Sequence, residues 1–319
     1  TGYHTRSMLV VPMSNREGEK LGVLQLINAQ DESGAVCPFS EDMTLVLESV
    51  ASQAAITIQN VRYIQEIKEL VHSFVRTMSS AIDQRSPYTG NRTRHMAAYC
   101  EKFIDYLNAR AKKGEGATFF SPQRREELLM SVWLHDIGKL VIPLEVMDKP
   151  SRLRPEQHEA FLHRMEIIRL KGEIEHLKGD MSSEDYEGLL AATREAENLI
   201  GELNIGRPLT DEQKEAVEVL SGRTYRDEGG QRPWLEPEEK AMLFIPRGTL
   251  SDEERKVIES HVSVTGRLLS EIRFSKELSH VCEWASSHHE LLNGKGYPRH
   301  LQGDEIPLEV RILTILDIY

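Results

Sequence analysis

The sequence has few of the features that mark secreted, membrane-spanning or nucleic-acid-binding proteins. Its three cysteines in 319 residues, Cys37, Cys100 and Cys282, are odd in number and far apart, which fits reduced cytoplasmic thiols better than a disulfide framework. No apolar run approaches the ~20 residues that a membrane span needs. The net charge is -12, so no basic excess is available to bind nucleic-acid phosphates. We therefore expect a cytoplasmic protein with no nucleic-acid partner and no membrane segment in this sequence.

The sequence begins and ends within stretches that look like parts of longer structural elements. It begins without methionine, and it stops at Asp317-Ile318-Tyr319 within an apolar run. We expect both ends to be cut from a longer protein, so targeting or membrane segments of that protein would lie outside this sequence. A chain of 319 residues has room for two domains, each with its own core.

The first part of the chain predicts a hairpin followed by a long helix. Residues 7–13 and 21–28 are short apolar runs separated by the polar turn SNREGEK, which is typical of two paired strands. Ser40 is a candidate N-cap, and Glu41 and Asp42 favour the positive end of a helix dipole. Because the stretch from there to about Ser86 lacks proline and glycine, it predicts one continuous helix.

Within this helix, six apolar residues follow a 3-4-3-4-3 spacing, which is the seam of a parallel coiled coil. Packing of this stripe on its own domain is the alternative, but we favour a parallel homodimer through residues 60–82. The six residues are Ile64, Ile67, Val71, Phe74, Met78 and Ala81.

From residue 86 onward, apolar residues recur at the three-four spacing of amphipathic helices, as in EELLMSVWLHDIGKL and ERKVIESHVSVTGRLLSEI. We find no convincing strand after residue 90. The pattern therefore predicts an all-α helical domain.

Two tight pairs of metal-ligand residues stand out in this helical region. His135-Asp136 lies in LHDIGKL, and His288-His289 opens HHELLNGKGYP. Imidazole and carboxylate are ligands that iron, manganese and zinc accept. Four such groups in two pairs predict a site for more than one ion, with metal-assisted hydrolysis as the expected reaction.

These residues carry a resemblance to a known family. HDIGK at 135–139, His261, HHE at 288–290, GKGYP at 294–298 and RILTILD at 311–317 resemble, in order, the motifs of the HD-GYP family. Its members are bacterial phosphodiesterases that hydrolyse cyclic di-GMP, a subgroup of the HD metal-dependent phosphohydrolases. Upstream, TGYHTRSMLVVPM, GVLQLIN and FSEDMTLVLESVASQAAITIQN are similar to the C-terminal half of a GAF domain, a small-molecule-sensing α/β module.

The resemblance implies a mainly α fold in three parts. These are a partial GAF domain over residues 1–58, a coiled-coil signalling helix over 59–85 and an all-α HD-GYP helical bundle over 86–319. KPSRLRPEQ at 149–157 and PRGTLSDEE at 246–254 both resemble the one segment that follows HDIGK in compact family members. We therefore expect an insertion over roughly residues 155–245, built around a charged helical hairpin of unassigned function.

The resemblance also implies two divalent metal ions, iron or manganese, and a hydroxide activated between them for attack on the phosphodiester. Asp136 is the candidate bridging ligand and a catalytic residue, because a carboxylate can bind one ion through each oxygen. The implied metal ligands are His135, Asp136, His261, His288, His289 and Asp317.

Further residues are expected to handle the substrate. Lys139 shares a helix face with His135 and Asp136, so its ammonium is a catalytic candidate that would hold a phosphate oxygen or protonate the leaving 3′-oxygen. Gly296, Tyr297 and Pro298 are expected in a loop at the mouth of the site. Arg311 is a further candidate substrate contact, with a structural ion pair as the alternative.

The sequence departs from the family at the first metal ligand. YTGNRTRH places Arg92 where the family has a ligand histidine, so that ligand is either absent or replaced by His95, three positions further on, through a shift of the helix. Arg92 would either weaken one metal site or bind substrate phosphate. Tyr88 stands where a glutamate recruits a third metal in some members, so we expect no trinuclear site.

The expected function is hydrolysis of cyclic di-GMP to pGpG or GMP in a sensor-output protein, with a diguanylate cyclase as a candidate partner. One alternative is an HD phosphohydrolase that acts on another nucleotide. The other is a degenerate module that binds cyclic di-GMP or a partner protein without hydrolysis.

Overall fold

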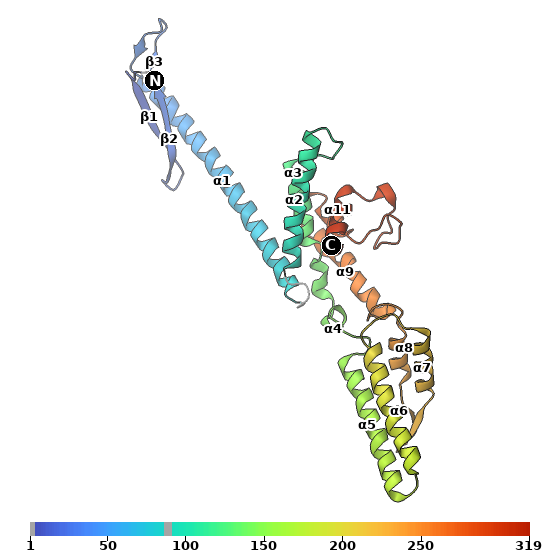
Figure 1. Ribbon diagram of the computed structural model, residues 1–319. Helices are drawn as coiled ribbons and strands as arrows, with labels where there is room; N and C mark the ends of the chain where they lie inside the picture. The colour runs from blue at the N-terminus through green and yellow to red at the C-terminus, as the bar shows by residue number, and fades with distance from the viewer. Residues whose placement is uncertain (1–3, 86–90) are drawn as a thin grey trace. The chain divides into compact units, whose positions relative to one another are not determined.

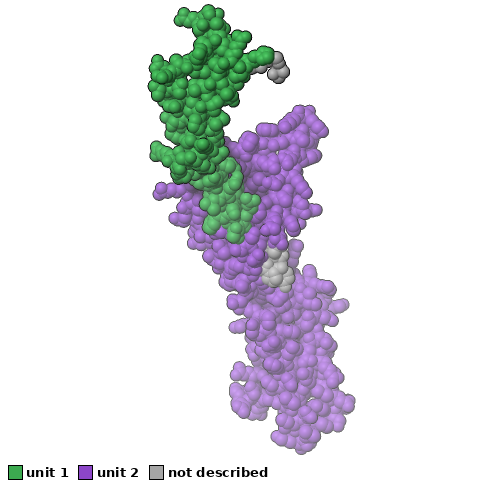
Figure 2. All heavy atoms as spheres, turned by 90° about the vertical axis from the view of Figure 1, so that its left-hand side faces the viewer, with its two compact units in different colours: residues 1–77 green, residues 78–319 purple. Residues whose placement is uncertain are grey.

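The computed structural model describes residues 4–85 and 91–319, so Tyr88 lies outside the described residues. The chain forms two compact units, residues 1–77 and residues 78–319, which are coloured separately in Figure 2. None of the helices in the part of the chain that the structure describes is both long and apolar enough to cross a membrane.

The first unit contains the predicted hairpin. Strand β1 (Met8–Ser14) pairs antiparallel with β2 (Lys20–Ile27), and β3 (Ala29–Gln30) pairs with β4 (Val36–Cys37) (Figure 1). Buried Val11 of β1 packs with Leu47 and Ala51 of the helix that follows. This small cluster fixes the hairpin against that helix.

The helix that follows is the predicted long one, α1 (Glu41–Asp83). Ser40 acts as its N-cap, because its Oγ accepts a hydrogen bond from the backbone N–H of Met43 at 3.2 Å. The apolar seam predicted for dimerisation lies largely in solvent, and Ile64, Ile67 and Phe74 are 58%, 60% and 63% exposed. The seam therefore has no partner within the described part of its own chain that covers these three side chains.

The second unit is a helical bundle with its own core. The longer helices are α2 (Arg92–Lys112), α3 (Pro122–Leu134), α9 (Asp252–Ser270) and α11 (Leu308–Ile318). Short helices connect them: η1 (Ile137–Val141), α4 (Leu144–Met147), η2 (Lys276–Leu278), α10 (Val281–Ala285) and η3 (Gly303–Glu305). Ile104, Leu128, Val132, Val310 and Leu313 are fully buried at the centre of the core. The predicted mainly α fold is confirmed.

Between α4 and α9 the chain folds around a second core. It contains α5 (Pro155–Lys178), α6 (Ser183–Leu203), α7 (Asp211–Ser221), β5 (Thr224–Asp227), β6 (Gly230–Pro233) and α8 (Pro237–Leu243). Phe161 and Met165 of α5 pack with Ile200 of α6 in this core. The expectation of no strand after residue 90 is wrong, since β5 and β6 form an antiparallel hairpin. Their four-residue runs, TYRD and GQRP, lack the alternating apolar pattern that signals a strand.

Two basic side chains tie the ends of this inserted segment together. The guanidinium of Arg152, which is fully buried, donates to the carbonyls of Leu203, Arg207 and Ile245 at 2.9, 2.7 and 2.7 Å. Lys149 Nζ lies 2.7 Å from the carboxylate of Glu254 in the first turn of α9. The segment is therefore anchored to the helix that also carries His261.

Candidate metal centre

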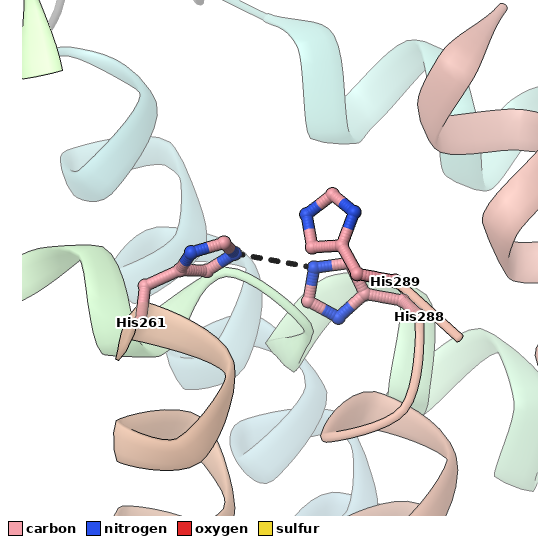
Figure 3. Close-up of side chains that lie close together, drawn as sticks. All are labelled: His261, His288 and His289. Atoms are coloured by element: carbon pink, nitrogen blue, oxygen red, sulfur yellow. Dashed lines mark hydrogen bonds between the residues drawn. The ribbon is translucent and has the colours of Figure 1, made fainter. Parts of the chain in front are cut away.

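Five different elements bring the six predicted metal ligands to one place. His135 caps the C-terminus of α3, and Asp136 precedes η1. His261 lies in α9, His288 and His289 follow α10, and Asp317 lies in the last turn of α11. Figure 3 shows His261 facing the adjacent pair His288 and His289, with a dashed line between the Nε2 atoms of His261 and His288 at 3.3 Å.

Three of the imidazoles are held in the same way. The Nδ1 atoms of His135, His261 and His288 lie 2.7, 2.6 and 2.7 Å from the carbonyl oxygens three residues earlier in the chain. A carbonyl only accepts, so each Nδ1 carries a proton and each Nε2 is the ring nitrogen turned toward the cluster. This is the arrangement by which proteins orient histidines as metal ligands.

The carboxylate of Asp136 lies among these Nε2 atoms. Its Oδ1 is 3.4 Å from His261 Nε2 and 3.9 Å from His288 Nε2. Its Oδ2 is 3.2 Å from His135 Nε2 and 2.7 Å from Lys139 Nζ. The two oxygens thus face different sets of ligand atoms, as a bridging carboxylate requires.

Asp317 and His289 extend the cluster. Asp317 Oδ1 is 3.7 Å from His135 Nε2, and Asp317 Oδ2 is 3.9 Å from His289 Nε2. Two triplets offer ligand atoms within 4.8 Å of one another: His261 with His288 and His289, and His135 with Asp136 and His288. His135 Nε2 is buried with no hydrogen-bond partner. A divalent cation would satisfy that atom, so these residues fit a metal ion.

The protonation states of His261, His288 and His289 suit a metal centre. Burial lowers the pKa of His261 and His288, and it lowers the pKa of His289 to about 4. These imidazoles are therefore neutral near pH 7 and able to bind a cation. Burial also opposes the charge on His135, but the carboxylates of Asp136 and Asp317 outweigh it and raise its pKa to about 10.

Close packing between η1 and α9 fixes the position of the His135-Asp136 pair. A Cβ atom on Gly138 would lie 1.9 Å from the carbonyl oxygen of His261, so only glycine fits there. The hydroxyl of Thr265 donates to the His135 carbonyl at 2.9 Å and accepts from the Gly138 N–H at 3.0 Å. Sequence reasoning missed Thr265, although it follows His261 by four residues and so shares its helix face.

Thr314 has the corresponding role on α11. Its hydroxyl donates to the carbonyl of His288 at 2.8 Å, and it lies three residues before Asp317. This residue was missed as well. Its position on the face of Asp317 was the available signal.

The Gly-Tyr-Pro loop packs directly on the histidine pair. A Cβ on Gly296 would lie 2.3 Å from the backbone nitrogen of Leu291, so the close approach requires glycine. The Tyr297 ring stacks on the His289 imidazole with a centroid distance of 4.8 Å, and half-buried Pro298 follows. The buried carboxylate of Glu290 accepts from the N–H groups of Arg299 and Leu301 at 2.6 and 2.9 Å, which closes the loop.

Arg311 holds a different part of this region. Its guanidinium donates to the carbonyls of Ile306 and Gly303, both at 2.8 Å, and lies 3.2 Å from Asp304 Oδ1. These contacts favour the structural alternative for Arg311 over a substrate contact.

The first-ligand position is taken by Arg92. Its Nη2 lies 2.8 Å from Asp317 Oδ1 and also donates to the Asp317 carbonyl. His95 is exposed and lines a cavity of about 530 Å³ together with Arg92, Tyr99 and Asp317. Among the described residues, the triplets of converging ligand atoms do not include His95.

The register of α2 explains this placement. The carboxylate of Asp83 accepts from the N–H and the hydroxyl of Thr93 at 3.1 and 2.9 Å, and Thr93 is buried. These two bonds fix the first turn of α2, so Arg92 rather than His95 meets Asp317.

Comparison with known proteins gives matches at both ends of the chain. Residues 235–319 match the HD domain family, and residues 1–58 match the GAF domain family. The resemblance predicted from the motifs is confirmed: a GAF segment precedes an HD domain.

Several bacterial phosphodiesterases are similar to this chain. The 3′3′-cGAMP-specific phosphodiesterase 1 of Vibrio cholerae is 43% identical over 83 residues, which cover 26% of this chain and 18% of that protein. The 3′3′-cGAMP-specific phosphodiesterase 2 of the same bacterium is 20% identical over 316 residues, covering 96% and 40%. A cyclic di-GMP phosphodiesterase of Thermotoga maritima is 28% identical over 148 residues, covering 42% and 39%. The matched segments therefore span less than half the length of these relatives.

Proposed function

We propose that this chain is the output part of a metal-dependent phosphodiesterase that hydrolyses a cyclic dinucleotide, with cyclic di-GMP as the first candidate. The observation that carries the proposal is the convergence of three imidazole Nε2 atoms on the two oxygens of Asp136. Such a cluster of imidazole nitrogens around one carboxylate suits borderline divalent metals, among which we propose iron or manganese, and a bound ion would displace the proton from His135 Nε2.

The cluster divides into two halves that share Asp136. His261, His288 and His289 face one oxygen of Asp136 or lie beside it, and His135 and Asp317 lie on the other side. Divalent ions held there would polarise the phosphate and lower the pKa of water. The residues themselves keep the ligand atoms fixed, since three imidazoles are already oriented by backbone carbonyls.

Lys139 is the proposed proton donor or phosphate contact. Its Nζ lies 2.7 Å from Asp136 Oδ2, and its side chain is 19% exposed. A lysine at the edge of the cluster can hold a phosphate oxygen while the carboxylate beside it keeps its charge partly neutralised. The same ammonium is placed to protonate a leaving 3′-oxygen.

The surroundings of the cluster offer room for the rest of a nucleotide. The cavity lined by Arg92, His95 and Tyr99 borders Asp317 and has a volume of about 530 Å³. Arg92 supplies positive charge for a second phosphate, and Tyr99 supplies a ring face for a base. Cleavage of one phosphodiester of cyclic di-GMP would give pGpG, and cleavage of the second would give GMP.

The N-terminal unit supports a signalling arrangement in which α1 joins two copies. Ile64, Ile67 and Phe74 are exposed at the spacing of a parallel coiled-coil seam. The GAF segment at the start of α1 and the HD domain after it suggest that a sensed molecule alters the paired helices and through them the enzyme.

A second candidate function is binding without hydrolysis. The observation that favours it is the pairing of Arg92 with Asp317, which removes a ligand from one half of the cluster. In that case the cavity beside Arg92 would bind the cyclic dinucleotide, and the GAF and helical parts would pass on the signal.

One assay separates these candidates. The purified chain, loaded anaerobically with Fe²⁺ or with Mn²⁺, is incubated with cyclic di-GMP, 3′3′-cGAMP and cyclic di-AMP, and the products are separated by chromatography. Linear products that require His261 support the phosphodiesterase, and the pattern across the three substrates gives its specificity. Binding of cyclic di-GMP by calorimetry without any linear product would contradict it and favour the binding module.

A further inference from the structure

Helix α5 is apolar on two opposite faces. One face, with Phe161, Met165 and Ile168, is buried against the core of the inserted segment. The other face carries four apolar residues that are exposed by 43%, 52%, 50% and 78%: Ile167, Leu170, Ile174 and Leu177. A helix that is apolar on two faces requires a second partner.

The exposed face has the spacing of a coiled-coil seam. Ile167, Leu170, Ile174 and Leu177 follow one another at intervals of three, four and three residues, so they occupy the a and d positions of two heptads. β-Branched isoleucine stands at both a positions and leucine at both d positions, which is the combination that favours two parallel strands.

The charges beside the seam select the orientation. Glutamate occupies the g positions, Glu166 and Glu173, and lysine occupies the e positions, Lys171 and Lys178. In a parallel pair a g residue faces the e residue of the following heptad on the other helix, which places each glutamate opposite a lysine. In an antiparallel pair g faces g and e faces e, so glutamate would meet glutamate and lysine would meet lysine.

We propose that the exposed face of α5 is an interface between two copies of this chain, in which the two α5 helices pair in parallel. The e and g charges indicate that a second copy of this chain covers the face, because the order of charges on α5 is complementary to itself in a parallel pair. Lys171 Nζ also lies 2.7 Å from the Arg226 carbonyl oxygen and 3.2 Å from Asp227 Oδ1 within its own chain. Its side chain is 38% exposed. The pair of Glu173 with the partner's Lys178 is therefore the cleaner test of the charge pattern.

Cysteine crosslinking tests the orientation directly. Leu170→Cys is introduced into a chain with Cys37→Ser and Cys282→Ser, leaving Cys100, which is buried and whose pKa is raised by that burial to about 12, as an unreactive thiol. In a parallel pair identical d positions meet, so mild oxidation is expected to give disulfide-linked dimers. The matched control is Glu187→Cys, an exposed position on α6, which is expected to stay uncrosslinked.

An antiparallel pair gives a different product. It would link Ile167→Cys chains to Leu177→Cys chains in a mixture, while Leu170→Cys alone would link poorly. Absence of a disulfide dimer from Leu170→Cys, or a yield no higher than that of Glu187→Cys, overturns the proposal. In that event a different protein is the candidate for the α5 face.

A charge exchange provides the second test. Adding Glu173→Lys to the Leu170→Cys chain places lysine opposite lysine at two symmetry-related contacts, and the crosslinking yield is expected to fall about five- to tenfold. Adding Lys178→Glu as well restores opposite charges and is expected to restore the yield. These positions are exposed, so circular dichroism of each variant should match the parent. A crosslinking yield that is unchanged by Glu173→Lys, or one that stays low after Lys178→Glu is added, contradicts the proposed pairing.

Discussion

The guanidinium of Arg92 lies 2.8 Å from Oδ1 of Asp317, and the same oxygen lies 3.7 Å from His135 Nε2 across the candidate metal centre. A guanidinium is always charged and cannot act as a ligand. It therefore neutralises Asp317 and repels a cation on that side, while the half that contains His261 and His288 has no such neighbour among the contacts described above. The two halves of the cluster are expected to bind metal unequally.

Arg92→His is expected to raise the metal content of the purified protein from about one ion to about two ions per chain, because a neutral imidazole replaces a repelling cation. Elemental analysis after loading with manganese measures this directly. His95→Ala is the matched control and is expected to leave the metal content unchanged. Wild-type protein that already holds two ions per chain, with loss of one in His95→Ala, would show that His95 is the replacement ligand.

Asp136→Ala and Lys139→Ala are expected to have different effects on metal content. Loss of Asp136 removes the carboxylate shared by both halves and should abolish both metal binding and hydrolysis. Loss of Lys139 should leave the metal bound and lower turnover by about a hundredfold or more, as for a removed proton donor. Metal content and turnover are measured on the same preparations. Equal loss of metal in the two variants would rule out the role given to Lys139.

Val71→Glu with Phe74→Glu is expected to weaken self-association through α1, because the seam would then bring like charges together. The dissociation constant from sedimentation equilibrium should rise by at least about tenfold. Gln65→Glu with Ser73→Glu adds the same charge at b and c positions, which face away from the seam, and is the control. An unchanged dissociation constant in the first pair of substitutions would place the interface elsewhere.

Thr265→Val is expected to weaken metal binding while preserving the fold. It keeps the side-chain shape but removes the hydroxyl that bonds to the His135 carbonyl and the Gly138 N–H. Loss of such an orienting contact typically costs about 10- to 100-fold in metal affinity, which calorimetric titration with Mn²⁺ would detect. Ser270→Ala, at the exposed end of the same helix, serves as the control. Equal affinities in the two variants would show that Thr265 does not position the ligands.

Glu254→Gln tests the anchor of the inserted segment and its pH dependence. Burial raises the pKa of Glu254, but Lys149, the Ser251 N–H and Arg154 together bring it below the usual 4.5. Because the folded-state pKa is depressed, the charge stabilises the fold above pH 4.5, and this contribution is lost as the pH falls further. The substitution should cost about 1–2 kcal/mol at pH 7.

Urea denaturation at pH 7 and at a pH below 4 is the measurement for Glu254→Gln. The difference from wild type should shrink at the lower pH, where the wild-type carboxylate also becomes protonated. Glu253→Gln, at an exposed neighbouring position, should have little effect at either pH. A difference that stays constant with pH would mean that the charge on Glu254 is not what stabilises the junction.

The sequence predicted the elements whose chemistry or periodicity is strong. The long helix after Ser40 and the hairpin before it were readable from their apolar spacing and their turns, and both are present. The convergence of distant candidate ligands such as His261 and Asp317 followed only from the family resemblance, because spacing along the chain carries no information on contacts between helices.

The structural features that the sequence did not predict all depend on contacts between segments that are distant in the chain. The β5–β6 hairpin is short and polar, so it owes its form to the surrounding packing rather than to its own pattern. Thr265 and Thr314 contribute through hydrogen bonds between their hydroxyls and the backbone of other elements, and in a sequence both residues look like ordinary helix residues. The contact between Arg92 and Asp317 joins residues 225 positions apart and depends on the first turn of α2.

The fully buried guanidinium of Arg152 limits how this protein can be shortened. Its partners are the carbonyls of Leu203, Arg207 and Ile245, so they belong to the inserted segment itself. Excision of that segment with a short linker would remove these three acceptors together with the second core that lies beside Arg152, so water would have to solvate the guanidinium instead. Arg152 therefore serves the inserted segment, and a shortened chain without that segment offers this side chain none of its three present acceptors.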